Sequence, residues 1–149
     1  MTVEQVHDMF ISWGYAFQAE YHYAFNAYLR EMLRRNRVMV VQNDIGDIEA
    51  LITYFITDDA TKFYKKGPWD TPEENLGGKH VYFDKMVAKD FGHFKIGIRH
   101  RFREFMEDYF KDQEELHYHR APFDKHVTMK RRRIFQNGIQ STSPVEQGV

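Results

Sequence analysis

Hydrophobic residues recur at helical spacing along the first part of the chain. Residues 2–13 carry one apolar stripe, and Thr2 followed by Gln5 matches a capping box, in which each side chain accepts a hydrogen bond from the other residue's backbone. Gly14 is expected to end this helix, and a second helix is predicted from Gln18 to Arg35. The inward face predicted for the second helix consists of Tyr21, Phe25, Tyr28, Leu29 and Met32.

The pattern then changes to that of β-strands. Residues 38–42 and 48–57 are rich in β-branched side chains, and turn-forming residues 43–47 separate them, so a β-hairpin is predicted. Residues 58–79 are polar, broken by glycine and proline, and predicted to be irregular. This segment is long for a plain connection, so it is expected to cover a site or to order on a partner. Trp69 within it either anchors the segment or belongs to a contact surface.

A strand, a loop with two glycines and a helix are predicted over residues 80–110. Alternation along the strand places Val81, Phe83 and Lys85 on one face and Tyr82, Asp84 and Met86 on the other. The loop contains Gly92 and Gly97, and an amphipathic helix follows from Ile98. The first turn of such a helix has backbone N–H groups without internal partners, which suits a phosphate ligand.

The rest of the chain predicts two further strands and a tail. Residues 114–121 and 126–135 alternate between apolar and polar positions and are expected to pair antiparallel. Residues 137–149 have the composition of a mobile tail. We therefore predict an α+β fold in one domain over residues 1–136, with a mixed, mostly antiparallel sheet and helices packed on its faces.

Composition narrows the class of protein. A chain of 149 residues is long enough to bury a core, and its 13 Phe and 9 Tyr indicate a core built of aromatic rings. The formal charge of −1 gives no overall attraction to nucleic acid or anionic membranes. The absence of cysteine excludes disulfides and thiolate chemistry. The sequence contains no run of membrane-spanning length and no pattern of a secretion signal, so a cytoplasmic location is expected.

The order of residues 80–110 resembles the acyl-CoA-binding segment of the GNAT acetyltransferase superfamily. In that family a strand ending in an apolar-x-Val pattern runs into an Arg/Gln-x-x-Gly-x-Gly/Ala turn and then a helix. Residues 86–91 (MVAKDF) match the strand end, and residues 92–97 (GHFKIG) occupy the place of the turn. Gly97 keeps its glycine, whereas Gly92 replaces the Arg or Gln, and His93 and Lys95 replace the earlier glycines. The resemblance implies a GNAT-like fold and an acyl-CoA donor held by Val87, Gly92, His93, Lys95 and Gly97.

A second resemblance, to the toxin-activating lysine acyltransferases, a divergent branch of the GNAT fold, points to catalytic residues. Members have a Ser-Trp pair before a catalytic His, and later an aromatic-apolar-Asp strand before an Ala-Pro-Phe-Gly motif. Here residues 12–13 precede His22, and residues 81–84 precede residues 87–92, with one extra residue before His22 and Lys-Asp in place of Pro. The resemblance implies His22 as a base that Asp84 orients. The alternative is an ordinary helix histidine and a strand carboxylate in a salt bridge.

Metal binding is a further hypothesis for the C-terminal strands. Alternation puts His117 and His119 on one face, and His126 across the hairpin would give a third imidazole. Carboxylates at a diagnostic spacing are lacking, and histidines are common on polar strand faces. We therefore predict no metal site.

The last strand is strongly basic. Lys130, Arg131, Arg132 and Arg133 would suit a phosphate backbone, an acidic protein partner, or an edge strand protected by charge against unwanted pairing. Cations that alternate between the two faces of a strand favour the edge strand over nucleic acid.

Two classes of function follow. In the first, the chain is an acyltransferase that moves an acyl group from a thioester donor to an amine. In the second, it is a catalytically inactive GNAT-like binding or assembly module of the kind that phages encode, for example as a virion-associated protein. The replaced glycines favour the module, and the His22–Asp84 pair favours the enzyme. Both imply a protein partner or protein substrate, and the number of aromatic residues suggests a homo-oligomer.

Overall fold

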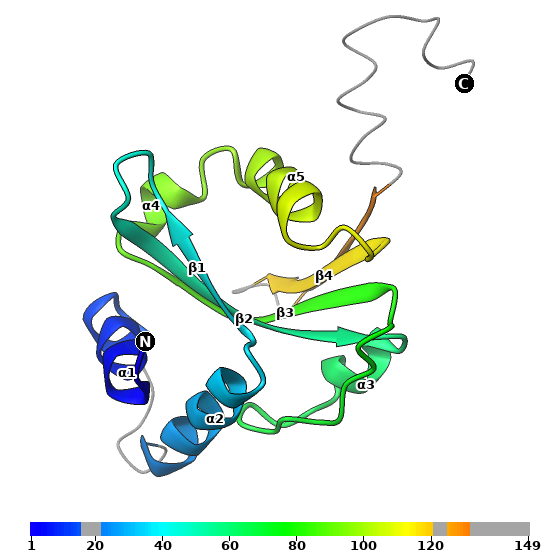
Figure 1. Ribbon diagram of the computed structural model, residues 1–149, viewed down its shortest axis with the longest axis horizontal. Coiled ribbons are helices and arrows are strands. Elements are labelled where there is room, and N and C mark those ends of the chain that lie inside the picture. Colours follow the sequence, from blue (N-terminus) through cyan, green and yellow to red (C-terminus); the bar gives the residue numbers. More distant parts are fainter. Residues whose placement is uncertain (16–21, 121–124, 132–149) are drawn as a thin grey trace, which may run out of the picture.

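The computed structural model describes residues 1–15, 22–120 and 125–131, which form an α+β fold. Helices lie on both sides of a five-stranded sheet (Figure 1). The elements in chain order are α1 (Val3–Ser12), α2 (His22–Arg34), β1 (Val38–Gln42), β2 (Ile48–Thr57), α3 (Ala60–Tyr64), β3 (His80–Ala88), α4 (Phe91–Phe94), α5 (Ile98–Asp108), β4 (Glu115–Arg120) and β5 (Lys125–Lys130). The predicted fold class is confirmed.

The strands lie side by side in their sequence order, from β1 to β5. The pairs β1–β2, β2–β3 and β4–β5 are antiparallel, whereas β3 and β4 are parallel. Parallel neighbours need a crossover connection, and the segment with α4 and α5 provides it. The predicted hairpin is confirmed at residues 38–57. In its turn the Asn43 side chain accepts hydrogen bonds from the N–H groups of Ile45 and Asp47, and Gly46 adopts a φ of +89°.

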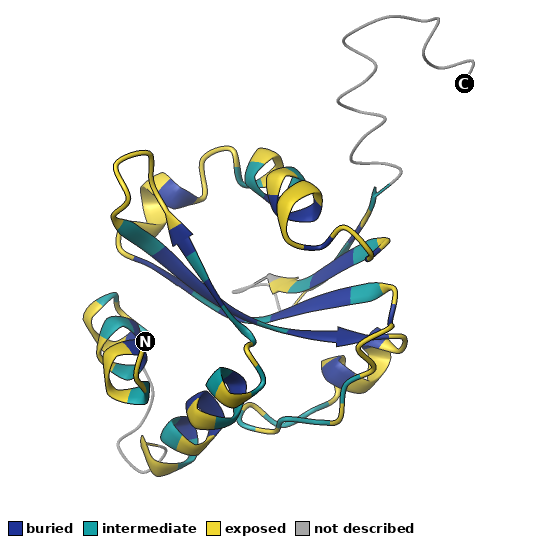
Figure 2. Ribbon diagram, viewed as in Figure 1, coloured by how far each residue is buried: buried dark blue, intermediate teal, exposed yellow. Residues whose placement is uncertain are grey.

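Each face of the sheet carries its own hydrophobic core. The face covered by α4 and α5, here called the α5 face, buries side chains from all five strands against helix residues such as Phe94, Phe102 and Met106. The opposite face, here called the α2 face, is covered by α1, α2 and α3, which pack on β1, β2 and β3. Figure 2 shows buried residues along the sheet and on the inward sides of the helices. Burial of a large apolar side chain contributes about 1.5–3 kcal/mol, so both layers stabilise the sheet substantially.

The N-terminal helices form much as the sequence predicts. Thr2 and Gln5 make the capping box at the start of α1, and Gly14 follows its end with a φ of +91°. Of the predicted inward face of α2, Phe25, Tyr28, Leu29 and Met32 are buried. Residues 16–21, where the second helix is predicted to begin, lie outside the described residues.

The long segment of residues 58–79 is held against the helices. It contains α3, a short helix that the polar composition did not predict. Arg35 at the end of α2 donates hydrogen bonds to the backbone carbonyls of residues 71–72. The Trp69 ring packs against the Phe25 ring, with centroids 5.3 Å apart. Trp69 therefore anchors the segment on the α2 face.

The C-terminal strands pair antiparallel, as predicted, and β5 is one of the two edge strands of the described sheet. Residues 132–135 of the predicted last strand and the predicted tail, residues 137–149, lie outside the described residues. In the described parts of the chain, we find no helix with the length and apolar character needed to cross a bilayer.

Candidate functional site

A β-bulge interrupts the ladder between β2 and β3. Thr53 pairs with Lys85, but the next residue of β2, Tyr54, pairs with Phe83, so Asp84 is an extra residue on β3. A bulge disturbs the alternation of side chains along its strand. Asp84 and Lys85 consequently both point to the α2 face.

The bulge corrects the predicted strand faces. Lys85 was expected beside Val81 and Phe83, but it lies on the opposite face, with its ammonium 5.0 Å from the centroid of the Tyr28 ring. Met86 packs instead with Val81 and Phe83 in the α5-face core. A pattern of period two cannot reveal the added residue, because the bulge depends on the register with β2.

The bulge assembles a buried polar cluster, here called the Asp84 network. The Tyr28 hydroxyl donates to Asp84 Oδ2 at 2.5 Å and lies 2.7 Å from the hydroxyl oxygen of Thr53. Lys66 Nζ lies 3.1 Å from Asp84 Oδ2, and Lys85 Nζ lies 3.8 Å from the same oxygen. The side chains of Lys66, Asp84 and Lys85 are 4%, 7% and 7% exposed. Two ammonium groups thus share one carboxylate in a nearly dry site.

Burial shifts the acid–base properties of the network. Burial lowers the pKa of Lys85 to about 8; Asp84 opposes this change and Lys66 reinforces it. Burial, together with Asp84, holds the pKa of Tyr28 well above its usual value. Tyr28 therefore stays protonated and donates to Asp84, while Lys85 can exchange a proton close to neutral pH.

The parallel strands part at the same place. The β3–β4 ladder runs from His80–Glu115 to Phe83–Tyr118. Beyond Phe83, β3 continues to Ala88 paired with β2, and β4 continues paired with β5. In Figure 1, β3 runs on toward α4. In the described part of the sheet, residues 84–88 thus have a backbone edge that no strand pairs on the β4 side.

The predicted catalytic pair lies on the same side of the sheet. Asp84 is in the network, and His22 begins α2, with its ring centroid 5.6 Å from that of His7. Among the hydrogen bonds and ion pairs between described residues, none joins His22 to Asp84, whose partners are Tyr28 and the two lysines. A catalytic role for the pair stays a prediction.

The predicted donor loop contains a helix that the sequence did not indicate. Gly92 and His93 lie within α4, and the Asp90 carboxylate caps that helix by accepting from the His93 N–H. Lys95 ends α4 and is exposed, and Gly97 begins α5 with a φ of +70° and no side-chain cap. A carboxylate at the start of α4 disfavours a phosphate there, whereas the start of α5 is open.

Val87, the remaining residue of the predicted donor site, is buried. It lies in the α2-face core with Tyr82 and Phe55. Val87 is therefore buried, whereas Lys95 and Gly97 of the same predicted site are exposed.

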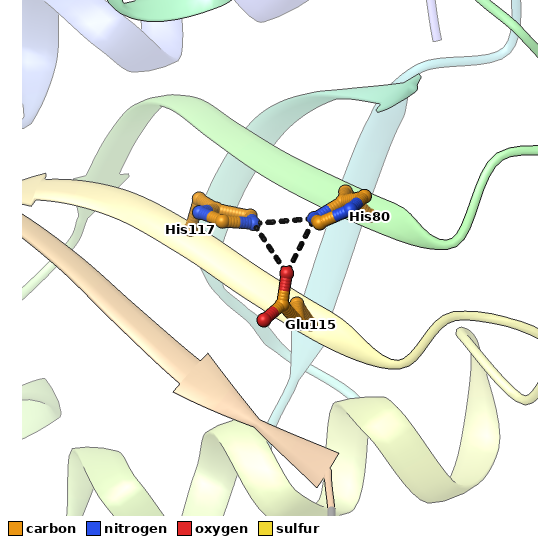
Figure 3. Close-up of side chains that lie close together, drawn as sticks. All are labelled: His80, Glu115 and His117. Atoms are coloured by element: carbon orange, nitrogen blue, oxygen red, sulfur yellow. Dashed lines mark hydrogen bonds and ion pairs between the residues drawn. The ribbon is translucent and has the colours of Figure 1, made fainter. Parts of the chain in front are cut away.

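A second polar group on the α2 face, here called the histidine cluster, consists of His80, Glu115 and His117 (Figure 3). His80 Nδ1 lies 2.7 Å from His117 Nε2 and 2.8 Å from Glu115 Oε2, and His117 Nε2 lies 3.6 Å from Glu115 Oε2. Glu115 and His117 point the same way from β4, and His80 is the ladder partner of Glu115 on β3. The carboxylate that the sequence appeared to lack is therefore Glu115.

The other histidines of the predicted set lie elsewhere. His126 Nε2 is 3.4 Å from His117 Nδ1, the nitrogen that faces away from the cluster, and His119 is exposed. His117 Nδ1 also lies 2.5 Å from the Tyr64 hydroxyl and 3.2 Å from the Thr128 hydroxyl. Burial, followed by the nearby His80 and His126, lowers the pKa of His117 to about 4.

The basic end of β5 is partly used inside the protein. The Arg131 guanidinium donates to the backbone carbonyls of Met106, Phe110 and Gln113, which fastens the strand to the end of α5. Lys130 is exposed and lies 3.9 Å from Glu115. Arg132 and Arg133 lie outside the described residues, so binding of nucleic acid to this run stays untested.

No model of a known protein family matches the sequence, and no curated protein matches it significantly.

Proposed function

We propose that the protein is an acyltransferase of GNAT type that moves an acyl group from an acyl-CoA thioester to an amine. One observation carries the proposal. The only parallel pair of the described sheet ends where a bulge turns Asp84 and Lys85 to the α2 face, and there the Asp84 carboxylate meets the Tyr28 phenol and the Lys66 and Lys85 ammonium groups.

The edge of β3 suits the arm of the donor. The β3–β4 ladder ends at Phe83, so residues 84–88 of β3 have no strand paired on that side within the described sheet. The arm of coenzyme A contains amide groups, which can pair with such an edge in the manner of an added strand. The reactive thioester would then lie beside Asp84 and Lys85.

The start of α5 suits the phosphates of the donor. Its first turn contains Arg99, His100 and Arg101 and no acidic residue, and Lys95 precedes it; of these, Arg101 is paired with Glu49 of β2. The positive charges of these residues are repelled by the positive end of the helix dipole, and a bound anion would compensate this repulsion. The donor would lie with its phosphates at α5 and its acyl group at the Asp84 network.

The residues then have the following roles. The amine nitrogen attacks the thioester carbonyl carbon, and His22 accepts the proton that the amine loses. Lys66, held by Asp84, stabilises the negative charge on the carbonyl oxygen. The carbon–sulfur bond breaks, and Lys85 gives a proton to the leaving thiolate, because its pKa of about 8 matches that of a thiol. Asp84 acts through the lysines rather than by orienting the His22 ring.

Calorimetric titration tests the proposal. Acetyl-CoA and longer acyl-CoA compounds are titrated into the wild-type protein, Lys95→Glu and Lys111→Glu. Lys111 is an exposed lysine just beyond the opposite end of α5, so its variant controls for the change in net charge. We expect saturable binding that Lys95→Glu weakens and Lys111→Glu does not. The absence of heat with every donor would exclude the enzyme.

A binding module is the second candidate, and a specific observation favours it. Asp84 is 7% exposed and bound by Tyr28 and Lys66, as in a purely structural network. In that case the protein binds a partner and transfers no acyl group. Three results together would support this candidate. The protein would bind acyl-CoA, it would transfer no acyl group to any amine, and Lys85→Met would leave the acyl-CoA binding unchanged.

A further inference from the structure

We propose that the histidine cluster binds a divalent transition-metal ion, with His80 Nδ1, His117 Nε2 and Glu115 Oε2 as ligands. Two imidazoles and one carboxylate are a common ligand set for zinc and for non-haem iron. This proposal does not depend on acyl transfer.

The distances suit a metal ion. The three donor atoms lie 2.7, 2.8 and 3.6 Å apart. With bonds of about 2.0–2.2 Å, tetrahedral ligands lie about 3.3–3.6 Å apart. One separation already falls in this range, and the other two need to widen by roughly half an ångström. Rotation of the three side chains would supply this widening.

The protons available do not satisfy the cluster by themselves. His80 Nδ1 lies within hydrogen-bond distance of both His117 Nε2 and Glu115 Oε2, but it carries at most one proton. Whether that nitrogen donates or accepts, it satisfies only one of these two contacts. A cation at the common point interacts favourably with all three donor atoms.

The surrounding protein fixes the ligands. His80 and Glu115 are partners in the β3–β4 ladder, so adjacent strands hold them in register. His117 Nδ1 faces the hydroxyls of Tyr64 and Thr128. Metal-bound histidines typically donate their second N–H to such a partner, which orients the ring. The cluster therefore has both ligands and the groups that position them.

The cluster is reachable from solvent. His80 and Glu115 also line an open hollow of about 450 Å³, together with Lys79, Glu114, Lys130 and Arg131. A bound ion would have a position free for water or another ligand. The lysines at the rim would favour an anionic ligand there.

Equilibrium dialysis with Zn²⁺, and visible absorption with Co²⁺, test this site. We expect about one ion per wild-type chain and a Co²⁺ spectrum of low coordination number. His80→Ala and the isosteric Glu115→Gln should each weaken Zn²⁺ binding at least tenfold. Tyr64→Phe, which removes a positioning hydroxyl, should weaken binding about tenfold.

Two control variants separate this site from incidental surface binding. His100→Ala removes an exposed histidine paired with Glu104, and His119→Ala removes the histidine next along β4 on the same side. Neither should change the affinity. Failure of the wild-type protein to bind Zn²⁺ or Co²⁺ stoichiometrically would overturn the proposal whatever the variants do. Binding that Glu115→Gln leaves unchanged, with the fold verified by circular dichroism, would overturn it as well.

Discussion

The Tyr28 hydroxyl is the uncharged group that contacts both Asp84 and Thr53 in the Asp84 network. Its removal therefore tests the proposed arrangement of the network more directly than any other single change. Tyr28→Phe keeps the buried ring and deletes the oxygen that donates to Asp84 and contacts Thr53. A hydrogen bond to a charged group contributes about 1.5–3 kcal/mol and one between neutral groups about 0.5–1.5 kcal/mol. Asp84 keeps its ion pair with Lys66, and Thr53 keeps its bond from the Lys85 N–H. We therefore expect a loss of about 2–3 kcal/mol in the free energy of unfolding.

Equilibrium denaturation with urea measures this loss. Tyr23→Phe makes the same chemical change on the same helix at a side chain that is 88% exposed, and should change stability by less than about 0.5 kcal/mol. A double-mutant cycle between Tyr28→Phe and Asp84→Asn should give a coupling energy above about 1 kcal/mol. A Tyr28→Phe loss below about 1 kcal/mol, or no coupling, would refute the proposed arrangement of the network.

Three further predictions test other parts of the structure. Lys85 has a pKa of about 8 when folded and about 10.5 when unfolded, so the unfolded state holds more protons at this residue between these values. In urea titrations at each pH, the stability of the wild type relative to Lys85→Met should therefore rise from pH 8 to 10, by at most about 2–3 kcal/mol, and a constant difference would contradict the shifted pKa. A Cβ on Gly78 would lie 2.3 Å from the carbonyl carbon of Thr57, so Gly78→Ala should lower the melting temperature by several degrees. Gly77→Ala should leave the melting temperature nearly unchanged, and equal effects of the two variants would contradict the close approach at Gly78. Phe102→Ala should lower the free energy of unfolding by about 3–5 kcal/mol, and a loss below about 2 kcal/mol would show that α5 is not packed as described.

Local patterns predicted the elements that depend on local chemistry. The hairpin of residues 38–57 was predicted with its observed bounds, because β-branched runs flank a turn whose Asn43 hydrogen-bonds its own backbone. The capping box was also predicted, because Thr2 and Gln5 hydrogen-bond to each other's backbone within one helical turn. The short helices α3 and α4 were missed, since a helix of four or five residues owes its existence to packing rather than propensity.

The Asp84 network depends on non-local contacts. The bulge on β3 arises from the register with β2, and Lys66 comes from a segment whose composition indicated only irregular structure. One local signal was present: two adjacent charges, Asp84 and Lys85, stand inside an otherwise apolar strand. Buried charges need oppositely charged or hydrogen-bonding partners, so this pair indicates a polar site inside the protein.

The sequence could predict only part of the histidine cluster. Glu115 and His117 are two residues apart on one strand, so they share a face. His80 lies 37 positions before His117, and the two meet through the parallel pairing of β3 with β4, a contact that local sequence does not reveal. The predicted partner His126 instead approaches the other ring nitrogen of His117.

The central claim, that an acyl-CoA donor occupies the space where β3 and β4 part, is tested most directly by hydrogen–deuterium exchange with and without acyl-CoA. We predict slower exchange of the backbone amides in residues 84–88 and in the first turn of α5. Unchanged exchange in both segments at saturating donor, or protection confined to other parts of the chain, would contradict the proposed site.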